Sequence, residues 1–104
     1  MKIWIDDVRQ PPHWELGNDS WHWATSVNAA INAIQYFEEW LKVELIDIDH
    51  DAGDYAKDGG DYVKVLDWLE ETGRNYPIRI HSMNPVGVEN MRRIIRKNGW
   101  TEVR

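Results

Sequence analysis

Residues 43–49 have the sequence VELIDID, and His50 and Asp51 follow directly. The β-branched and apolar residues of this stretch predict a buried strand, of the kind found inside a parallel sheet. The acids at its end predict that the strand runs out into a polar loop. Residues 1–5 and 78–82 repeat the pattern, since each is a short apolar run with polar side chains at or just beyond its end.

Stretches with helical periodicity separate these strands. Ser26 is placed to cap a helix that reaches Leu41, and Asn84 is placed to cap a last helix that ends at Gly99. Between them, apolar residues at helical spacing predict a helix over residues 62–73. Strands and helices therefore alternate along the chain.

Two further strands are expected over residues 20–25 and 100–104. The alternation predicts an α/β fold, with one domain over residues 1–104. We expect a flavodoxin-like three-layer sandwich, in which helices cover both faces of a five-stranded parallel sheet of order 2-1-3-4-5. Pro11 and Pro12 exclude a regular helix after the first strand, so the first helix of this fold is expected to be degenerate.

The composition limits the possible functions. The chain has 104 residues, a formal net charge of −6 and no cysteine, which excludes a disulfide scaffold and a thiolate nucleophile. The negative charge argues against general nucleic-acid binding, because phosphate backbones repel an acidic surface. No apolar run approaches membrane-spanning length and nothing resembles a signal peptide, so a cytoplasmic protein without a membrane partner is expected.

Polar side chains follow three of the expected strands. In an open parallel sheet, ligands bind beyond the carboxyl ends of the strands, where the strand order reverses. The side chains expected on this rim are Asp6, Asp7 and Arg9 after the first strand, Asp49, His50 and Asp51 after the third, and His81, Ser82 and Asn84 after the fourth. Each alone is explained as an ordinary turn or structural residue, but their convergence on one rim favours a functional site. Trp14 lies in a loop that could fold over this rim.

The chemistry of these residues points to a metal and a phosphate. Carboxylates this dense repel one another unless something positive lies among them. Such an oxygen site suits Mg²⁺ or Mn²⁺, and an added imidazole shifts the preference toward Mn²⁺, Zn²⁺ or Ni²⁺. The NPVG turn (residues 84–87) opens a helix whose free N–H groups and positive dipole end attract a phosphate. Ser82 and Asn84 offer further donors, and Arg9 offers a charge-assisted contact.

Four segments resemble the cyclic-phosphate processing receiver domain family. They are IDDVRQPP (residues 5–12), DIDHDAGD (47–54), GGDYVKVLDWLE (59–70) and IRIHSMNPVGVENM (78–91). The resemblance implies a receiver-like fold that carries out metal-dependent processing of cyclic phosphates, such as the ADP-ribose cyclic phosphate left by RNA repair and tRNA splicing. It also implies a set of active residues, namely Asp6, Asp7, Asp49, His50, Asp51, His81 and Asn84. Two features depart from signalling receivers and weaken a phosphorelay role. They are the lack of a clear lysine after strand 4 or 5, and the prolines after strand 1.

The leading hypothesis is therefore a metal-dependent phosphoesterase that acts on a small, phosphorylated, nucleotide-derived ligand. Its metal ligands would be Asp6, Asp7, Asp49 and Asp51, its catalytic residues Asp49, His50 and His81, and its phosphate-binding residues Arg9, Ser82 and Asn84. One alternative is a receiver that accepts a phosphoryl group at Asp49, and another is a non-catalytic module that binds a nucleotide or a protein. The identity of the metal, the role of Asp49 as nucleophile or ligand, the histidine that acts as acid and the oligomeric state stay open.

Overall fold

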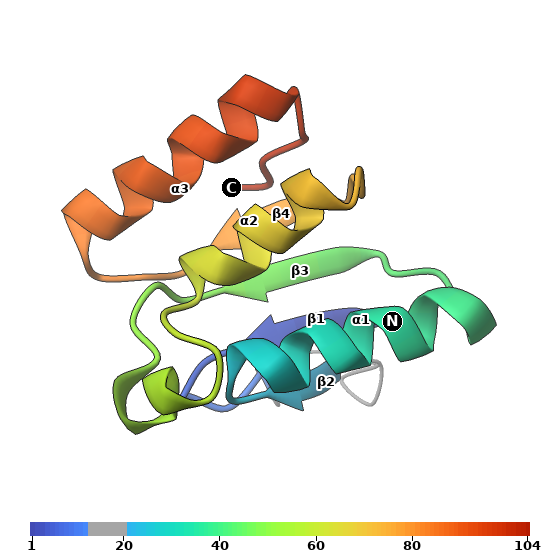
Figure 1. The fold of residues 1–104 in the computed structure, drawn as a ribbon, viewed down its shortest axis with the longest axis horizontal. Helices are drawn as coiled ribbons and strands as arrows, with labels where there is room; N and C mark the ends of the chain where they lie inside the picture. Colours follow the sequence, from blue (N-terminus) through green and yellow to red (C-terminus); the bar gives the residue numbers. More distant parts are fainter. Residues whose placement is uncertain (13–20) are drawn as a thin grey trace.

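The computed structural model describes residues 1–12 and 21–104, so Trp14 and Ser20 lie outside the described residues. The described elements follow one another as β1 (Lys2–Ile5), β2 (Trp21–Ala24), α1 (Val27–Trp40), β3 (Leu45–Ile48), a 3-10 helix (Gly53–Lys57), α2 (Val63–Glu71), β4 (Ile78–Ile80) and α3 (Pro85–Asn98) (Figure 1). The predicted α/β alternation is therefore confirmed. Among these elements, no helix is both long and apolar enough to cross a membrane.

The four strands form one parallel sheet of order β2-β1-β3-β4. This matches the predicted order for the first four strands and puts β1 and β3 at its centre. The register pairs Ile5 with Ile48, and Ile48 with Ile80, so these three strands end level with one another. The chain segments that leave them begin at one edge of the sheet.

The prediction of a fifth strand is wrong for the described residues. Residues 100–104 lie beside β4, but they form a single parallel bridge, between Glu102 and Ile78. Two backbone hydrogen bonds make this bridge, from Ile78 N–H to Thr101 O at 3.0 Å and from Val103 N–H to Ile78 O at 2.8 Å. β4 is only three residues long, and Trp100 is drawn into the core instead of pairing along it. A longer ladder therefore does not form.

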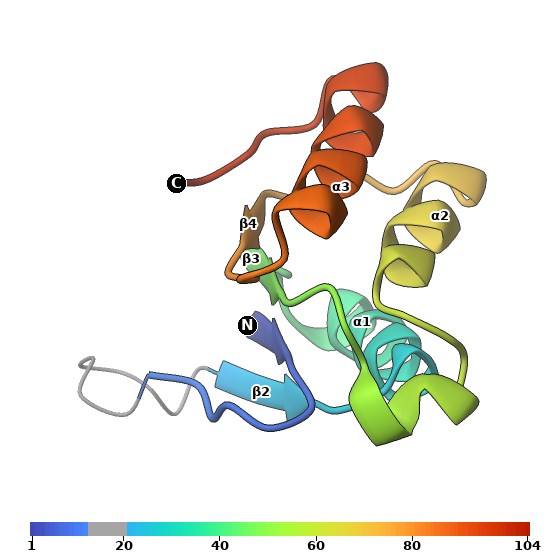
Figure 2. The same ribbon diagram turned by 90° about the vertical axis from the view of Figure 1, so that its left-hand side faces the viewer.

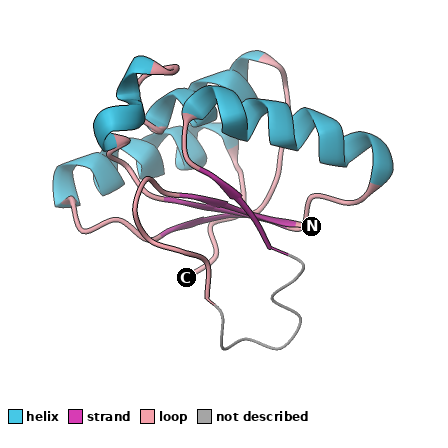
Figure 3. Ribbon diagram, turned by 90° about the horizontal axis from the view of Figure 1, so that it is seen from below, coloured by secondary structure: helices cyan, strands magenta, loops and turns pink. Residues whose placement is uncertain are grey.

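The prediction of helices on both faces is also corrected, because α1, α2 and α3 all cover one face of the sheet (Figures 2 and 3). The steps from β2 to β3 and from β3 to β4 cross the sheet in the same direction, and right-handed crossovers then put their helices on the same face. The step from β1 to β2 runs the opposite way. Its described part, residues 6–12, contains no helix. The described chain therefore forms two layers instead of three.

The core lies between the sheet and the three helices. Its strand residues alternate along each strand, so that Ile3 and Ile5, like Ile46 and Ile48, point toward the helices and are fully buried. Fully buried apolar residues of the helices face them, among them Ala30, Ile34, Val65, Leu66, Leu69 and Met91. The residues between the isoleucines therefore point to the opposite, helix-free face.

Both predicted helix caps are confirmed. Ser26 Oγ accepts the N–H of Ala29 at 3.0 Å and caps α1. Asn84 Oδ1 accepts the N–H of Gly87 at 3.0 Å and caps α3. These caps fix where the helices leave the sheet edge, and the second one fixes the chain just after His81.

Candidate metal and phosphate site

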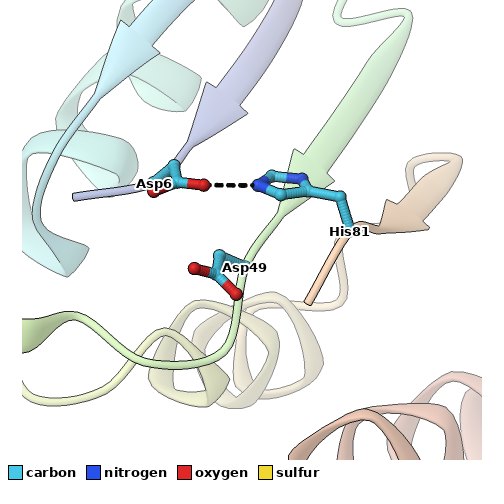
Figure 4. A group of neighbouring side chains, drawn as sticks. All are labelled: Asp6, Asp49 and His81. Carbon is cyan, nitrogen blue, oxygen red and sulfur yellow. Dashed lines mark hydrogen bonds and ion pairs between the residues drawn. The ribbon is translucent and has the colours of Figure 1, made fainter. Parts of the chain in front are cut away.

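Three side chains meet where β1, β3 and β4 end. Asp6 directly follows β1, Asp49 follows β3 and His81 follows β4, so the level ends of these strands bring together residues 75 positions apart. One ligand atom from each lies within 4.8 Å of the others. Figure 4 shows Asp6 and His81 pointing toward one another, with the Asp49 carboxylate beside them. The rim predicted from the sequence is thus present, with these three side chains at its centre.

Asp6 is a fully buried carboxylate with several donors around it. Its Oδ1 accepts the backbone N–H groups of Val8 and Arg9, both at 3.0 Å, and its Oδ2 lies 2.9 Å from His81 Nε2. Burial alone would raise the pKa of Asp6, but the two backbone N–H groups and His81 outweigh it and hold the pKa below its usual value. Asp6 is therefore an anion fixed in place at neutral pH.

The imidazole of His81 is held on three sides. Its Nε2 faces Asp6, while its Nδ1 lies 2.6 Å from Asp47 Oδ1. The indole of Trp4 stacks on the ring, with centroids 4.0 Å apart and planes 5° apart. The ring therefore has little freedom to turn or to leave the rim.

Asp47 and its partner Arg79 were not recognised as site residues from the sequence. Arg79 Nε donates to Asp47 Oδ2 at 2.7 Å, and the two residues are paired in the register of β3 and β4. Part of this arrangement can be read from the sequence, because side chains two residues apart on a strand point to the same face. Asp47 is therefore on the same side as Asp49, and Arg79 on the same side as His81. Linking the two strands requires their register, which the sequence does not provide.

Asp7 lies next to this cluster but is not one of its three members. Its Oδ2 approaches Gly53 so closely that a Cβ added there would lie 2.4 Å away, and Gly53 has a φ of 55°. Burial raises the pKa of Asp7, and the neighbouring charges of Asp6 and Asp49 raise it further. The carboxylates are therefore close enough to destabilise one another, which is the situation that a bound cation relieves.

His50 and Asp51 form a pair at the outer side of the rim. His50 Nδ1 lies 2.8 Å from Asp51 Oδ1, and the ring packs over Gly87 in the first turn of α3. The exposed carboxylate of Asp51 also accepts a long hydrogen bond of 3.4 Å from Asn84 Nδ2. These contacts keep the pair beside the cluster of Asp6, Asp49 and His81, but outside it.

A pocket of about 360 Å³ opens beside the cluster. Its lining residues are Arg9, Asp49, Asp51, Ser82, Met83 and Asn84. All three residues predicted to bind phosphate are among them. The start of α3 offers fewer free donors than expected, because Pro85 has no N–H and the N–H of Gly87 is already taken by Asn84. An anion in this pocket would therefore depend more on side-chain donors than on the helix start.

The donor set fits a divalent cation. Two carboxylates and one imidazole combine hard oxygen ligands with a nitrogen ligand, which suits Mn²⁺ or Zn²⁺ better than Mg²⁺. Compared with the predicted set, the structure brings Asp6 and Asp49 together with His81, places Asp7 next to them and turns Asp51 toward His50. Two of the four acids predicted as ligands, Asp6 and Asp49, therefore lie in the cluster, and its third member is the imidazole of His81.

A family model described as the cyclic-phosphate processing receiver domain matches residues 1–97. No curated protein and no solved structure matches the chain. The matched range contains every residue of the cluster and of the pocket.

Proposed function

The chain belongs to the cyclic-phosphate processing receiver domain family, and on this premise we propose that it is a metal-dependent phosphoesterase that opens a cyclic phosphate of a nucleotide-derived molecule. The observation that carries the proposal is the position of the cluster of Asp6, Asp49 and His81 directly beside the pocket, with Asp49 belonging to both. A cation site that borders an anion pocket suits the hydrolysis of a phosphate ester.

In this proposal Asp6, Asp49 and His81 hold the cation, and Asp7 adds negative charge beside them. A divalent cation there supplies charge neutralisation at the phosphate and makes water a better nucleophile. The residues around the cation keep its ligands in place, since Asp6 is fixed by two backbone N–H groups and His81 by Asp47 and Trp4.

The phosphate occupies the pocket, where the positive charge of Arg9 and the polar side chains of Ser82 and Asn84 surround it. Arg9 reaches back toward the rim, as its Nη1 lies 3.4 Å from the backbone oxygen of His81. A guanidinium in this place gives a charge-assisted contact to an anionic oxygen. Arg9, Ser82 and Asn84 therefore form the side of the pocket that suits a phosphodiester anion, while a cation held by the cluster would offset the Asp49 carboxylate on the other side.

Ring opening needs an acid for the leaving oxygen. A water oxygen forms a bond to phosphorus and releases one proton to the solvent, while the bond from phosphorus to one ribose oxygen breaks. That oxygen takes up a proton from the acid, which solvent later restores, so the product is a phosphate monoester with a free hydroxyl. We assign the proton donor as His50, because His81 belongs to the cluster, whereas His50 lies between Asp49 and Asp51 in the sequence, and both of these residues line the pocket. Asp51 holds the Nδ1 side of the His50 ring, which leaves Nε2 as the atom that gives the proton.

The test is phosphorus NMR on metal-stripped protein mixed with ADP-ribose cyclic phosphate or with 2′,3′-cyclic nucleotides, with and without Mn²⁺. We expect conversion of the cyclic resonance to a monoester only when the metal is present, and none with the Asp49→Asn variant. Binding without conversion under every metal condition would contradict the proposal and support a binding module. A stoichiometric acid-labile phosphate on Asp49, formed from a small phosphodonor, would support a receiver role instead.

A further inference from the structure

The helix-free face of the sheet carries a buried charge that the proposed reaction does not use directly. Asp47 lies in the middle of β3, and its side chain is fully buried. Its neighbours across the sheet are Trp4 on β1 and Arg79 on β4, each paired with it in the register. His81 completes this group, because it is one pleat beyond Arg79 on the same side of β4.

Both oxygens of Asp47 are occupied, each by a different partner. Oδ2 lies 2.7 Å from Arg79 Nε and 2.6 Å from Arg79 Nη2, so both guanidinium nitrogens approach the same oxygen. Oδ1 lies 2.6 Å from His81 Nδ1. Arg79 therefore fixes the rotation of the carboxylate so that its other oxygen faces the histidine.

Stability alone gives a weak reason for this arrangement. Burial removes the Asp47 carboxylate from water at a cost, and Arg79, whose side chain is 34% exposed, keeps part of its hydration. Such a pair adds little net stability, because the attraction between the charges is largely offset by the lost hydration of the buried one. Ile46 and Ile48, on either side of Asp47, face the helices and form the core there, so the packing of that core does not require the carboxylate. The charge at Asp47 therefore calls for a function connected with its partner His81.

We propose that Asp47 is a positioning residue that keeps a proton on His81 Nδ1 and thereby presents His81 Nε2 to Asp6 and Asp49. The contact at Nδ1 sets which nitrogen faces the site, and the stacked Trp4 sets the plane of the ring. A carboxylate behind a ligand histidine also makes that histidine a better ligand. The inference rests on the proposed function only in that His81 belongs to the proposed site.

The first measurement is a long-range ¹H–¹⁵N correlation spectrum of the histidine rings in the metal-free protein. We expect His81 Nδ1 to carry a proton in the wild type, and we expect the ring nitrogen resonances of His81 to move in the Asp47→Asn variant. A wild-type spectrum in which only Nε2 carries the proton would overturn the proposal, even if no variant folds.

The second measurement is calorimetric titration with Mn²⁺ alone. Asp47→Asn is expected to weaken the binding by about 10–100-fold, the usual effect of losing a residue that supports a metal ligand. The matched control is Asp58→Asn, which removes a carboxylate bonded to Ser26 and Asn28 and leaves the cluster untouched. Asp47→Glu keeps the charge but displaces it by one methylene, so it should bind Mn²⁺ with an affinity between those of the wild type and Asp47→Asn.

Two outcomes would overturn the inference. In one, Asp47→Asn folds with unchanged His81 resonances; in the other, its affinity for Mn²⁺ equals that of Asp58→Asn. Neither measurement involves a phosphate ester. Both therefore still test the role of Asp47 if the protein does not hydrolyse the proposed substrates. Conversely, wild-type turnover combined with unchanged His81 resonances would reject the role of Asp47 and retain the proposed function.

Discussion

The imidazole of His50 packs directly on the backbone of Gly87, so closely that a Cβ built on Gly87 would lie 2.4 Å from His50 Cγ. Gly87 is in the first turn of α3, and its φ is not positive, so the absence of a side chain matters here for space and not for backbone conformation. The His50 ring therefore occupies the space that a side chain at Gly87, in the first turn of α3, would need.

Gly87→Ala tests this fit. The added methyl group must displace the His50 ring, and we expect a stability loss of about 1–3 kcal/mol from overpacking together with a large fall in kcat. Affinity for Mn²⁺ should stay within about twofold, since His50 is outside the cluster. Chemical denaturation, turnover and calorimetry on the same variant separate the three effects. Full activity in Gly87→Ala would show that the position of His50 is unimportant.

Two histidine substitutions should have different effects. His81→Gln removes a proposed ligand, so Mn²⁺ affinity should fall by more than about 100-fold, beyond the effect expected for a supporting residue. His50→Gln should bind Mn²⁺ like the wild type but lose at least about 100-fold in kcat, the usual contribution of a general acid. Calorimetry and phosphorus NMR measure the two quantities. Equal loss of metal affinity in both variants would reject the division of roles.

Asp7→Asn should stabilise the metal-free protein. Burial, together with the charges of Asp6 and Asp49, raises the pKa of Asp7, so the folded state favours its neutral form and the ionised form destabilises the fold at neutral pH. An amide removes this repulsion, and we expect a higher Tm without metal but a weaker response of Tm to Mn²⁺. A lower Tm in the metal-free variant would contradict this account. The exposed Asp54→Asn, in the 3-10 helix, is the matched control.

The contacts of Glu38 with Arg74 and Tyr76 should stabilise the folded state over a limited pH range. The hydrogen bonds from Arg74 lower the pKa of Glu38 and outweigh the opposing effect of burial, with a further contribution from Tyr76. This stability is present above the unfolded pKa of about 4.3 and is lost as the pH falls through the lower folded value. Burial, and then the contact with Glu38, raise the pKa of Tyr76 to about 12. The stability that the Tyr76 hydroxyl contributes is therefore complete below its unfolded pKa of about 10, and it is lost as the pH rises toward 12.

Glu38→Gln therefore should cost about 1–2 kcal/mol at pH 7. The cost should shrink as the pH falls below 4, because the wild-type carboxylate is then protonated as well. Urea unfolding at several pH values measures this, with the exposed neighbour Glu39→Gln as the control. A cost that is the same at pH 3 and pH 7 would contradict the assigned cause.

Metal binding should itself stabilise the fold. At a Mn²⁺ concentration of about 100 times Kd, a ligand that binds only the folded state adds about 2.7 kcal/mol. We expect this gain in the wild type and its absence in Asp49→Asn. Thermal unfolding with and without Mn²⁺ measures the difference. An equal gain in both proteins would place the cation elsewhere.

The sequence was informative where the signal is local. Caps at Ser26 and Asn84, and strands that end in acids or a histidine, depend on neighbouring residues and were predicted correctly. Within the described residues, the predicted fifth strand and third layer were wrong, because strand pairing and the face that each helix covers depend on contacts between residues far apart in the sequence. For the same reason, the convergence on one rim was foreseen from topology, but the contact between Asp47 and His81 was not.

The helices of the described chain lie on one side of the sheet, and this affects which residues the other side can carry. The face that carries no helix among residues 1–12 and 21–104 has no need to be apolar, so the middle of the sheet is free to hold an arginine, an aspartate and a tryptophan in one row. A relative that packed a fourth helix there would have to replace that row with aliphatic residues. It would then lose the contacts by which Asp47 and Trp4 hold His81 in this chain.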